Sequence, residues 1–314
     1  MAIRMLNDDE VRRWLDPAEL LEALAWGFTA LSTGEVVAPP RNGVDVEGGF
    51  LLSMMAHAAG HPIGVKLVSV FHGNHAFGLP GHLALIALFD AQTGAPVAVM
   101  NGTWVTALRT AGGAALSARL LARTQVETLA IVGAGVQGDA HLRMLSLVRD
   151  FKDIRIASLR HDDARRVAAA DPRARAVASV EEAVAGADVV CLCTTSSTPV
   201  VHRAWLAPGA HVTSVGYMPP GSELAPDIVR HARLFVETRI AFAPPPAGCA
   251  ELAGLDPEGA AELGEVLTGR RAGRVADSEL TLYKSMGHAV EDLVAARLVY
   301  ERATTAGAGT LFTL

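Results

Sequence analysis

Residues 128–145 read TLAIVGAGVQGDAHLRML and decide the fold of the middle of the chain. An apolar segment runs into a glycine-rich turn, and a segment with helical spacing follows it. Gly133 permits a tight bend, Gly135 lets the backbone approach a pyrophosphate, and Gly138 allows close packing of helix on strand. The first amide groups of the helix then face an anion. A purely structural turn is the alternative, but the flanking strand and helix favour dinucleotide binding.

The chain after residue 125 alternates between strand-like and helical segments. VETLAIVG, DIRIAS, ADVVCLCT and HVTSVG are typical of buried strands. Helices are expected from about residue 137, after the acids Asp162 and Asp163, and after Ser179, which has capping-box spacing with Glu182. This alternation predicts an α/β fold, a Rossmann doubly wound parallel sheet with helices on both faces.

The chain before this unit has a different pattern. Asp16, Pro17 and Glu19 begin a helix that Gly34 ends. Four strand-like segments lie between residues 50 and 100, and the turn at 90–94 predicts an antiparallel pair. Helical spacing returns at 103–123 and again at about 284–303. These segments indicate a separate α+β unit.

Composition excludes several classes of protein. The chain has 314 residues, of which 50% are hydrophobic, and a net charge of −6, which gives no electrostatic signature for nucleic acid. No apolar run approaches the ~20 residues that span a bilayer. The N-terminus carries acids where a secretory signal would be apolar. Cys191, Cys193 and Cys249 form no disulfide framework or metal-ligand pattern. We therefore expect a cytoplasmic protein without a metal, a membrane anchor or a nucleic-acid partner.

The choice of dinucleotide depends on the end of the second Rossmann strand. An NAD site would place Asp or Glu about 20 residues after the glycine turn. This chain has Ser158 there, and Arg160 two residues further on. A hydroxyl and a guanidinium suit a 2′-phosphate, so NADP(H) is favoured over NAD(H). The alternative is a solvated Arg160, with Asp162 or Asp163 on the ribose rather than capping a helix.

Several segments together are similar to the ornithine cyclodeaminase/mu-crystallin family over nearly the whole chain. They are PPRNG at 39–43, GVKLVSVFHGN at 64–74, GTWVTALRTAG at 102–112, VGAGVQG, ADVVCLCTTSSTPV, PPGSEL, and LGEVLTGR followed by LTLYKSMGHAVEDLVAARLVY. The family's members are NAD(P)-dependent enzymes acting on amino acids and cyclic imines, together with a lens and thyroid-hormone-binding relative. The order and spacing of these segments are more specific to the family than the glycine turn alone.

The resemblance implies a homodimer with two domains. Residues 1–120, joined by the C-terminal helix at 290–314, would bind substrate and dimerise, and residues 121–289 would form the Rossmann domain. The resemblance and the glycine turn together place these residues at the cofactor: Arg109, Thr110, Gly133, Gly135, Val136, Gln137, Gly138, Ser158, Arg160, Thr194, Thr195, Ser196, Val215, Gly216 and Ser285.

The resemblance also assigns Arg41, Lys66 and Arg109 to the substrate's carboxylate and reacting nitrogen. Lys66 interrupts an apolar strand, and a desolvated lysine can transfer protons near neutral pH. The alternative is an edge-strand lysine with its tip in water. Arg109 lies mid-helix among small residues and faces either a cleft or solvent. Arg41 follows two prolines in a loop, where arginines are commonly solvated.

One position departs from the family. Cyclodeaminating members carry an aspartate shortly before the P-G-x-x-E-L segment, and here Tyr217 and Met218 stand there. Asp227 lies further on and is expected to cap a helix. Loss of a general acid or base typically reduces the rate by ~10²–10⁴. Cyclodeamination is therefore disfavoured, whereas hydride transfer to an imine needs no such carboxylate.

Two further side chains remain open. His82 lines the substrate pocket or is an ordinary strand-end histidine. Glu223 belongs to the family motif and has either a site role or a structural role in closing its turn. His72 and His75 lack metal-ligand spacing.

The sequence thus predicts an NADPH-dependent reductase of imines of 2-oxo acids, or the reverse amino-acid dehydrogenase, with a small imino or amino acid as substrate. Lys66 and Arg109 would be catalytic, and Arg41, Lys66, Arg109 and His82 would bind substrate. A cyclodeaminase with an altered acid and a non-enzymatic, crystallin-like NADPH-binding protein are the alternatives.

Overall fold

The computed structural model describes residues 2–313, which form two compact units. The first unit consists of Met1–Arg109 and Gly287–Leu314, and the second of Thr110–Met286. The sequence suggests divisions at 120/121 and 289/290 instead. The first division in the structure falls inside the helix α3 (Thr103–Leu121), where nothing in the local sequence marks a break.

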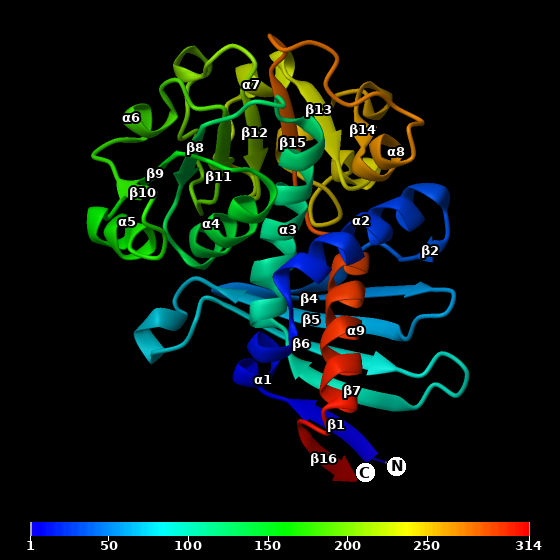
Figure 1. The fold of residues 1–314 in the computed structure, drawn as a ribbon. Helices are drawn as coiled ribbons and strands as arrows, with labels where there is room; N and C mark the ends of the chain where they lie inside the picture. Colours follow the sequence, from blue (N-terminus) through cyan, green and yellow to red (C-terminus); the bar gives the residue numbers. More distant parts are fainter. Residues whose placement is uncertain (1, 314) are drawn as a thin grey trace. The chain divides into compact units, whose positions relative to one another are not determined.

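The first unit is built on an eight-stranded sheet (Figure 1). Its strands run in the order β16-β1-β7-β6-β5-β4-β2, and β3 also pairs with β4. All neighbouring strands are antiparallel except β1 and β7. The antiparallel pair predicted around residues 90–94 is therefore confirmed. The bounds are β1 Ala2–Leu6, β2 Val36–Val37, β3 Asn42–Val46, β4 Gly49–Ala58, β5 Ile63–Phe71, β6 His82–Phe89, β7 Pro96–Asn101 and β16 Thr310–Thr313.

Helices cover one face of this sheet. The helix α9 (Ala289–Thr305) packs on β4, β5 and β6 and against α2 (Pro17–Thr33), and α1 (Asp8–Trp14) also contacts it (Figure 1). Asp16 caps α2 and Gly34 ends it, as the sequence predicts. A Cβ on Gly64 would lie 3.1 Å from Leu293 Cδ1, so this glycine lets α9 approach the sheet closely.

The opposite face of the sheet exposes apolar side chains. Cross-strand pairing places them on the side away from Lys66, because successive residues of a strand point to opposite faces. They are between 38% and 44% exposed: Met5, Leu51, Met55, Leu67 and Leu85. We call these five residues the apolar sheet face.

The second unit has a fully parallel sheet with the order β10-β9-β8-β11-β12-β15-β13-β14. Strand order reverses direction at β8 and β11, and ligands of such sheets bind outside the carboxyl ends of the strands at that point. The predicted Rossmann fold is confirmed. The strands are β8 Thr128–Val132, β9 Asp153–Ala157, β10 Ala174–Ala176, β11 Val189–Leu192, β12 His211–Ser214, β13 Arg233–Val236, β14 Ala261–Glu262 and β15 Thr281–Lys284.

The helices of the second unit begin near the expected residues, but two of the expected caps are wrong. Asp162 and Asp163 lie in the first turn of α5, whose N-cap is Arg160, and Asp227 lies in the first turn of α7, whose N-cap is Ala225. Acids in a first turn favour the helix dipole without accepting the capping hydrogen bond. The bounds are α4 Val136–Val148, α5 His161–Ala168, α6 Val180–Val184, α7 Pro226–His231 and α8 Leu263–Leu267. The short 3-10 helices are η1 Asn74–Phe77, η2 Arg203–Trp205, η3 Arg239–Phe242, η4 Ala250–Leu252 and η5 Pro257–Gly259.

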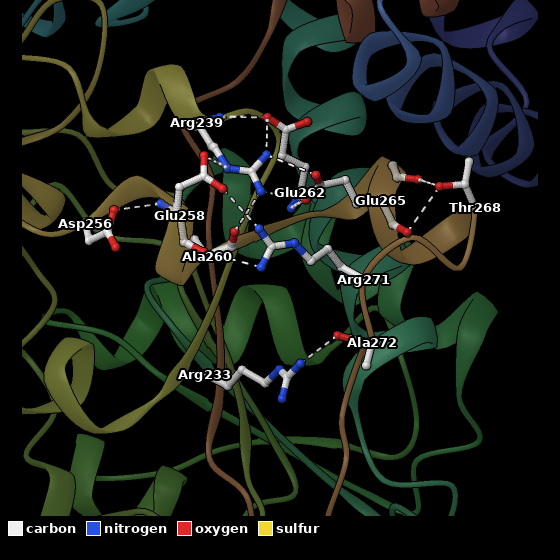
Figure 2. Close-up of polar contacts among 11 residues, drawn as sticks. Arg233, Arg239, Asp256, Glu258, Ala260, Glu262, Glu265, Thr268, Arg271 and Ala272 are labelled. Atoms are coloured by element: carbon white, nitrogen blue, oxygen red, sulfur yellow. Dashed lines mark hydrogen bonds and ion pairs between the residues drawn. The ribbon is translucent and has the colours of Figure 1, made fainter.

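Figure 2 shows a network of ion pairs around β14 and α8. The guanidinium of Arg239 lies 2.9 Å from the carboxylate of Glu265 and 3.4 Å from that of Glu262. Arg271 pairs with Glu258 at 3.1 Å, and both side chains are more than two-fifths exposed. A pair this exposed contributes little to stability, whereas Arg239, Glu262 and Glu265 are 22%, 12% and 14% exposed.

Candidate functional site

A buried ionic cluster occupies the first unit beneath α9. Lys66 of β5 lies 2.8 Å from a carboxylate oxygen of Asp292, and Arg109 Nε donates to the same carboxylate at 3.0 Å. Arg109 also lies 3.4 Å from Glu291. The four residues are at most 5% exposed. Charges so completely removed from water require partners, and here two acids balance two cations. We call these four residues the charge cluster.

Lys66 lies in the interior of the sheet. Its strand pairs with β4 and β6, and its cross-strand neighbours Met54 and Ile86 are apolar. The edge-strand alternative is therefore wrong. Burial, together with the charge of Arg109, lowers the pKa of Lys66 to about 8, against the opposing influence of Asp292. An ammonium with such a pKa can exchange its proton near neutral pH.

Arg109 and Arg41 meet around Gly287. Arg41 donates to the Gly287 carbonyl oxygen at 2.8 Å. A Cβ on Gly287 would overlap the Arg109 guanidinium, and the residue has φ +70°, so glycine is required on both counts. The structure therefore places Arg109 in a buried, acid-lined position and brings the loop residue Arg41 to the same glycine. With Lys66, these arginines are the three cations that the sequence assigns to the substrate.

His82 lies at the start of β6, and the charges of the cluster influence its pKa. Burial and then the charges of Lys66 and Arg109 lower its pKa to about 4, which keeps the imidazole neutral at physiological pH. His72 and His75 are exposed. Within residues 2–313 no group of three or more His, Cys, Asp or Glu side chains has an arrangement that could hold a metal ion.

The glycine turn of the second unit fits a pyrophosphate. Gly133 has φ +104°, and a Cβ there would run into the Cys193 carbonyl. A Cβ on Gly138 would strike the Gly133 carbonyl, whereas one on Gly135 would meet nothing within 4 Å. Gly135 is also the N-cap of α4, and no side chain caps that helix. Open space in front of uncapped amides is what a phosphate needs.

The residues proposed to select the dinucleotide follow β9. Ser158 is half-buried directly after the strand, and the Arg160 side chain is 80% exposed and donates to Asp163 at 2.7 Å. Sequence analysis did not single out a further cation, Arg166, which donates to the carbonyl oxygen of Ala134, within the glycine turn, at 2.8 Å. Arg166 lies on the second turn of α5, and its spacing from the start of that helix could have indicated it in the sequence.

Glu223 joins two loops that follow parallel strands. One carboxylate oxygen accepts from the Thr194 amide and hydroxyl, both at 2.7 Å. The other accepts from the Ser214 hydroxyl at 2.9 Å and the Gly216 amide at 2.7 Å. Glu223 is 1% exposed. Of the two roles left open by the sequence, the geometry favours the structural one: Glu223 fixes two loops and bonds directly to Thr194 and Gly216, which are predicted cofactor residues.

The second unit also contains a buried lysine, as the first unit does. Lys284 is fully buried at the end of β15, 3.1 Å from Glu251, and donates to the Gly216 carbonyl oxygen at 2.6 Å. Burial would raise the pKa of Glu251, but Lys284 and its hydrogen bonds lower it. Sequence analysis did not single out this pair.

The other predicted residues are distributed over the second unit. Tyr217 and Met218 are half-buried after β12, and Met218 forms an isolated bridge with Gly221. Ser285 is buried and donates to Glu237 at 2.7 Å, so its hydroxyl is engaged within the unit. Thr110 is buried, Thr195 and Val136 are exposed, and the remainder are partly buried: Gln137, Thr194, Ser196, Val215 and Gly216.

Asp292 and Glu291 are the main residues that sequence reasoning missed. They lie in GHAVEDLVAARLVY, where only the apolar stripe of the helix was used. Two acids at the buried start of an apolar helix need cationic partners, and that requirement was the available signal.

Comparisons with known proteins agree with this architecture. The family model described as "Ornithine cyclodeaminase/mu-crystallin family" matches residues 2–307. The chain belongs to this family. It is 37% identical over 305 residues to the ketimine reductase mu-crystallin of Mus musculus, covering 94% of this chain and 96% of that protein.

Two solved structures are similar over their whole length. The Thermococcus litoralis Δ1-pyrroline-2-carboxylate reductase, in complex with NADH and L-proline, has a TM-score of 0.92 and 31% identity, covering 98% of this chain and 99% of that one. An archaeal alanine dehydrogenase, described as a dimer with bound NAD, has a TM-score of 0.91 and 30% identity and covers 100% of both chains. Two proteins whose structures hold NADH or NAD thus share the complete fold of this chain.

Proposed function

We propose that this protein is an NAD(P)H-dependent reductase of imines of 2-oxo acids, which also catalyses the reverse dehydrogenation of the amino acid. The observation that carries the proposal is the buried charge cluster, in which Lys66 has a pKa near 8. Similarity to a ketimine reductase and to a pyrroline-2-carboxylate reductase supports the same reaction.

In this proposal the first unit binds the substrate. Arg109 and Arg41, which both approach Gly287, bind the substrate's carboxylate, and a guanidinium matches a carboxylate with two parallel hydrogen bonds. His82, kept neutral by its surroundings, lines the pocket. Reduction places a hydride on the imine carbon and a proton on the imine nitrogen. The Lys66 ammonium donates that proton and is recharged from solvent.

The second unit binds the cofactor. A bound nicotinamide dinucleotide supplies the hydride. Gly133, Gly135 and Gly138, with Val136 and Gln137 between them, hold its pyrophosphate against α4. Ser158 and Arg160 stand where an NAD site would carry an acid, so we propose a preference for NADPH over NADH. The loops joined by Glu223 contribute Thr194, Thr195, Ser196, Val215 and Gly216, and Thr110 and Ser285 complete the proposed set.

We also propose a homodimer formed through the apolar sheet face. Its five side chains are 38–44% exposed. Contiguous apolar surface of this kind commonly marks an interface. The similar alanine dehydrogenase is described as a dimer. No helix among the described residues is long and apolar enough to cross a membrane. Three free cysteines, two of them buried, suit the reducing cytoplasm that we propose as its location.

The test is oxidation of NADPH and NADH across a panel of cyclic ketimines and of 2-oxo acids with and without ammonia or methylamine. We expect turnover with at least one imine, and faster turnover with NADPH. Ammonia release from ornithine or lysine without net cofactor oxidation would instead show cyclodeamination, which Tyr217 and Met218 disfavour. Tight cofactor binding with no turnover on any imine would show a binding protein.

A further inference from the structure

The side chain of Asp292 touches both buried cations of the charge cluster. Its two oxygens lie 3.0 Å and 2.8 Å from Lys66 Nζ, and it accepts from Arg109 Nε at 3.0 Å. The residue is 3% exposed and stands in the first turn of α9, which packs on the strand of Lys66. A single carboxylate from a third element therefore fixes the spacing between the two cations.

The electrostatic situation of Lys66 depends on this carboxylate. Burial and Arg109 disfavour the ammonium, whereas Asp292 and, more weakly, Glu291 favour it. His82 is neutral, and the cross-strand neighbours of Lys66 are apolar. Arg41 contacts the backbone at Gly287 on the same side of the unit. Among these groups Asp292 most strongly stabilises the ammonium form of Lys66.

We propose that Asp292 is a positioning residue for imine reduction, which holds Lys66 in its ammonium form and orients Arg109. The inference rests on the proposed function, because the proton that Asp292 retains on Lys66 is the one delivered to the imine nitrogen. Arg109, held through Nε by Asp292 and through a terminal nitrogen by Glu291, presents its guanidinium in one orientation. Asp292 acts through both cations.

The experiment is the pH dependence of kcat for the wild-type protein and for Asp292→Asn, with an imine identified from the panel. Activity requires protonated Lys66, so kcat falls as the pH rises through the pKa of that ammonium. Removing the neighbouring negative charge lowers that pKa, and the alkaline limb moves to lower pH by about 1–3 units. Below the shifted limb the variant recovers activity that a merely damaged site would not recover. Any titration of the substrate itself is common to both proteins and cancels in the comparison.

Two further variants complete the test. Glu291→Gln removes the weaker acid and is expected to shift the limb in the same direction by less, and it carries the test if Asp292→Asn does not fold. Glu301→Gln, on the same helix but half-exposed and paired with Arg297, is the matched control and leaves the limb in place. A lower rate at every pH with an unmoved limb in both Asp292→Asn and Glu291→Gln would overturn the inference. A wild-type protein that reduces no imine would overturn the proposed function instead.

Discussion

Two buried lysines, one in each unit, have different surroundings. Lys284 meets one acid, a backbone carbonyl oxygen and, at 3.4 Å, the Ser214 hydroxyl. Lys66 meets one acid that it shares with a second cation, Arg109. Lys284 thus meets two neutral oxygens beside its acid, whereas Lys66 shares its acid with a second cation.

We interpret this difference as that between a structural lysine, Lys284, and the proposed proton donor, Lys66. Burial and the neighbouring guanidinium of Arg109 lower the pKa of Lys66 to about 8, so its ammonium can exchange a proton near neutral pH. Burial alone does not distinguish the two lysines, since Lys66 is 2% and Lys284 is 0% exposed.

The largest stability effect is expected at Lys284. Lys284→Met leaves Glu251 buried without its cation and the Gly216 carbonyl without a donor, which should lower the free energy of unfolding by about 3–5 kcal/mol. Lys66→Met should lower it by less, because Asp292 keeps the hydrogen bond from Arg109. Urea unfolding of both variants measures the difference. A larger loss in Lys66→Met would remove the distinction between the two lysines.

A comparable effect on binding is expected at Arg109. If its guanidinium binds a substrate carboxylate in a desolvated site, Arg109→Ala should weaken substrate binding by about 2–5 kcal/mol. Cofactor affinity should change much less, because the glycine turn that is proposed to hold the pyrophosphate belongs to the other unit. Calorimetry with the amino-acid product and with NADPH separates the two affinities. Unchanged affinity for the amino acid would show that Arg109 serves only as the partner of Asp292 and Glu291.

A smaller effect is expected at the exposed Arg160. Arg160→Ala should reduce the preference for NADPH over NADH by about 1.5–3 kcal/mol, the contribution of a hydrogen bond to a charged group. Its pair with Asp163 is 80% exposed on the arginine side, so stability should not change measurably. The affinities of both cofactors for wild-type and variant protein provide the measurement. Equal affinities in the wild-type protein would contradict the NADP assignment.

The smallest effect is expected at the exposed pair of Arg271 and Glu258 in Figure 2. Arg271→Ala removes a pair whose side chains are 42% and 70% exposed, and it should change the free energy of unfolding by less than about 1 kcal/mol. Thermal unfolding at low and high salt is a suitable assay. A loss as large as that of Lys284→Met would show that exposure is a poor guide to the role of an ion pair in this protein.

The local rules of the sequence predicted the elements of both units well. The cap at Asp16, the strands around Lys66 and the glycine turn each depend on neighbours in the chain, and the structure confirms them. The family and the reaction class also followed from quoted motifs. The caps proposed at Asp162 and Asp227 were wrong because an acid one or two residues into a helix resembles a cap in sequence.

The charge cluster could not be predicted in the same way. Lys66 and Asp292 are 226 residues apart, and no local pattern connects them. The motif named the cations, but their acidic partners came only from the packing of α9 on the sheet. The same holds for Lys284 and Glu251, which meet through a loop after β13. Long-range compensation of charge was the information that the sequence lacked.

The most direct test of the account is a paired measurement on Lys66→Met: turnover by cofactor absorbance and cofactor affinity by fluorescence, on the same folded sample. The account predicts a kcat lower by about 10²–10⁴-fold, the usual contribution of a general acid, with the affinity for NADPH unchanged. Lys284→Met, at a temperature where it remains folded, should lose much less turnover. Full turnover by Lys66→Met would contradict the claim that this buried lysine delivers the proton to the imine.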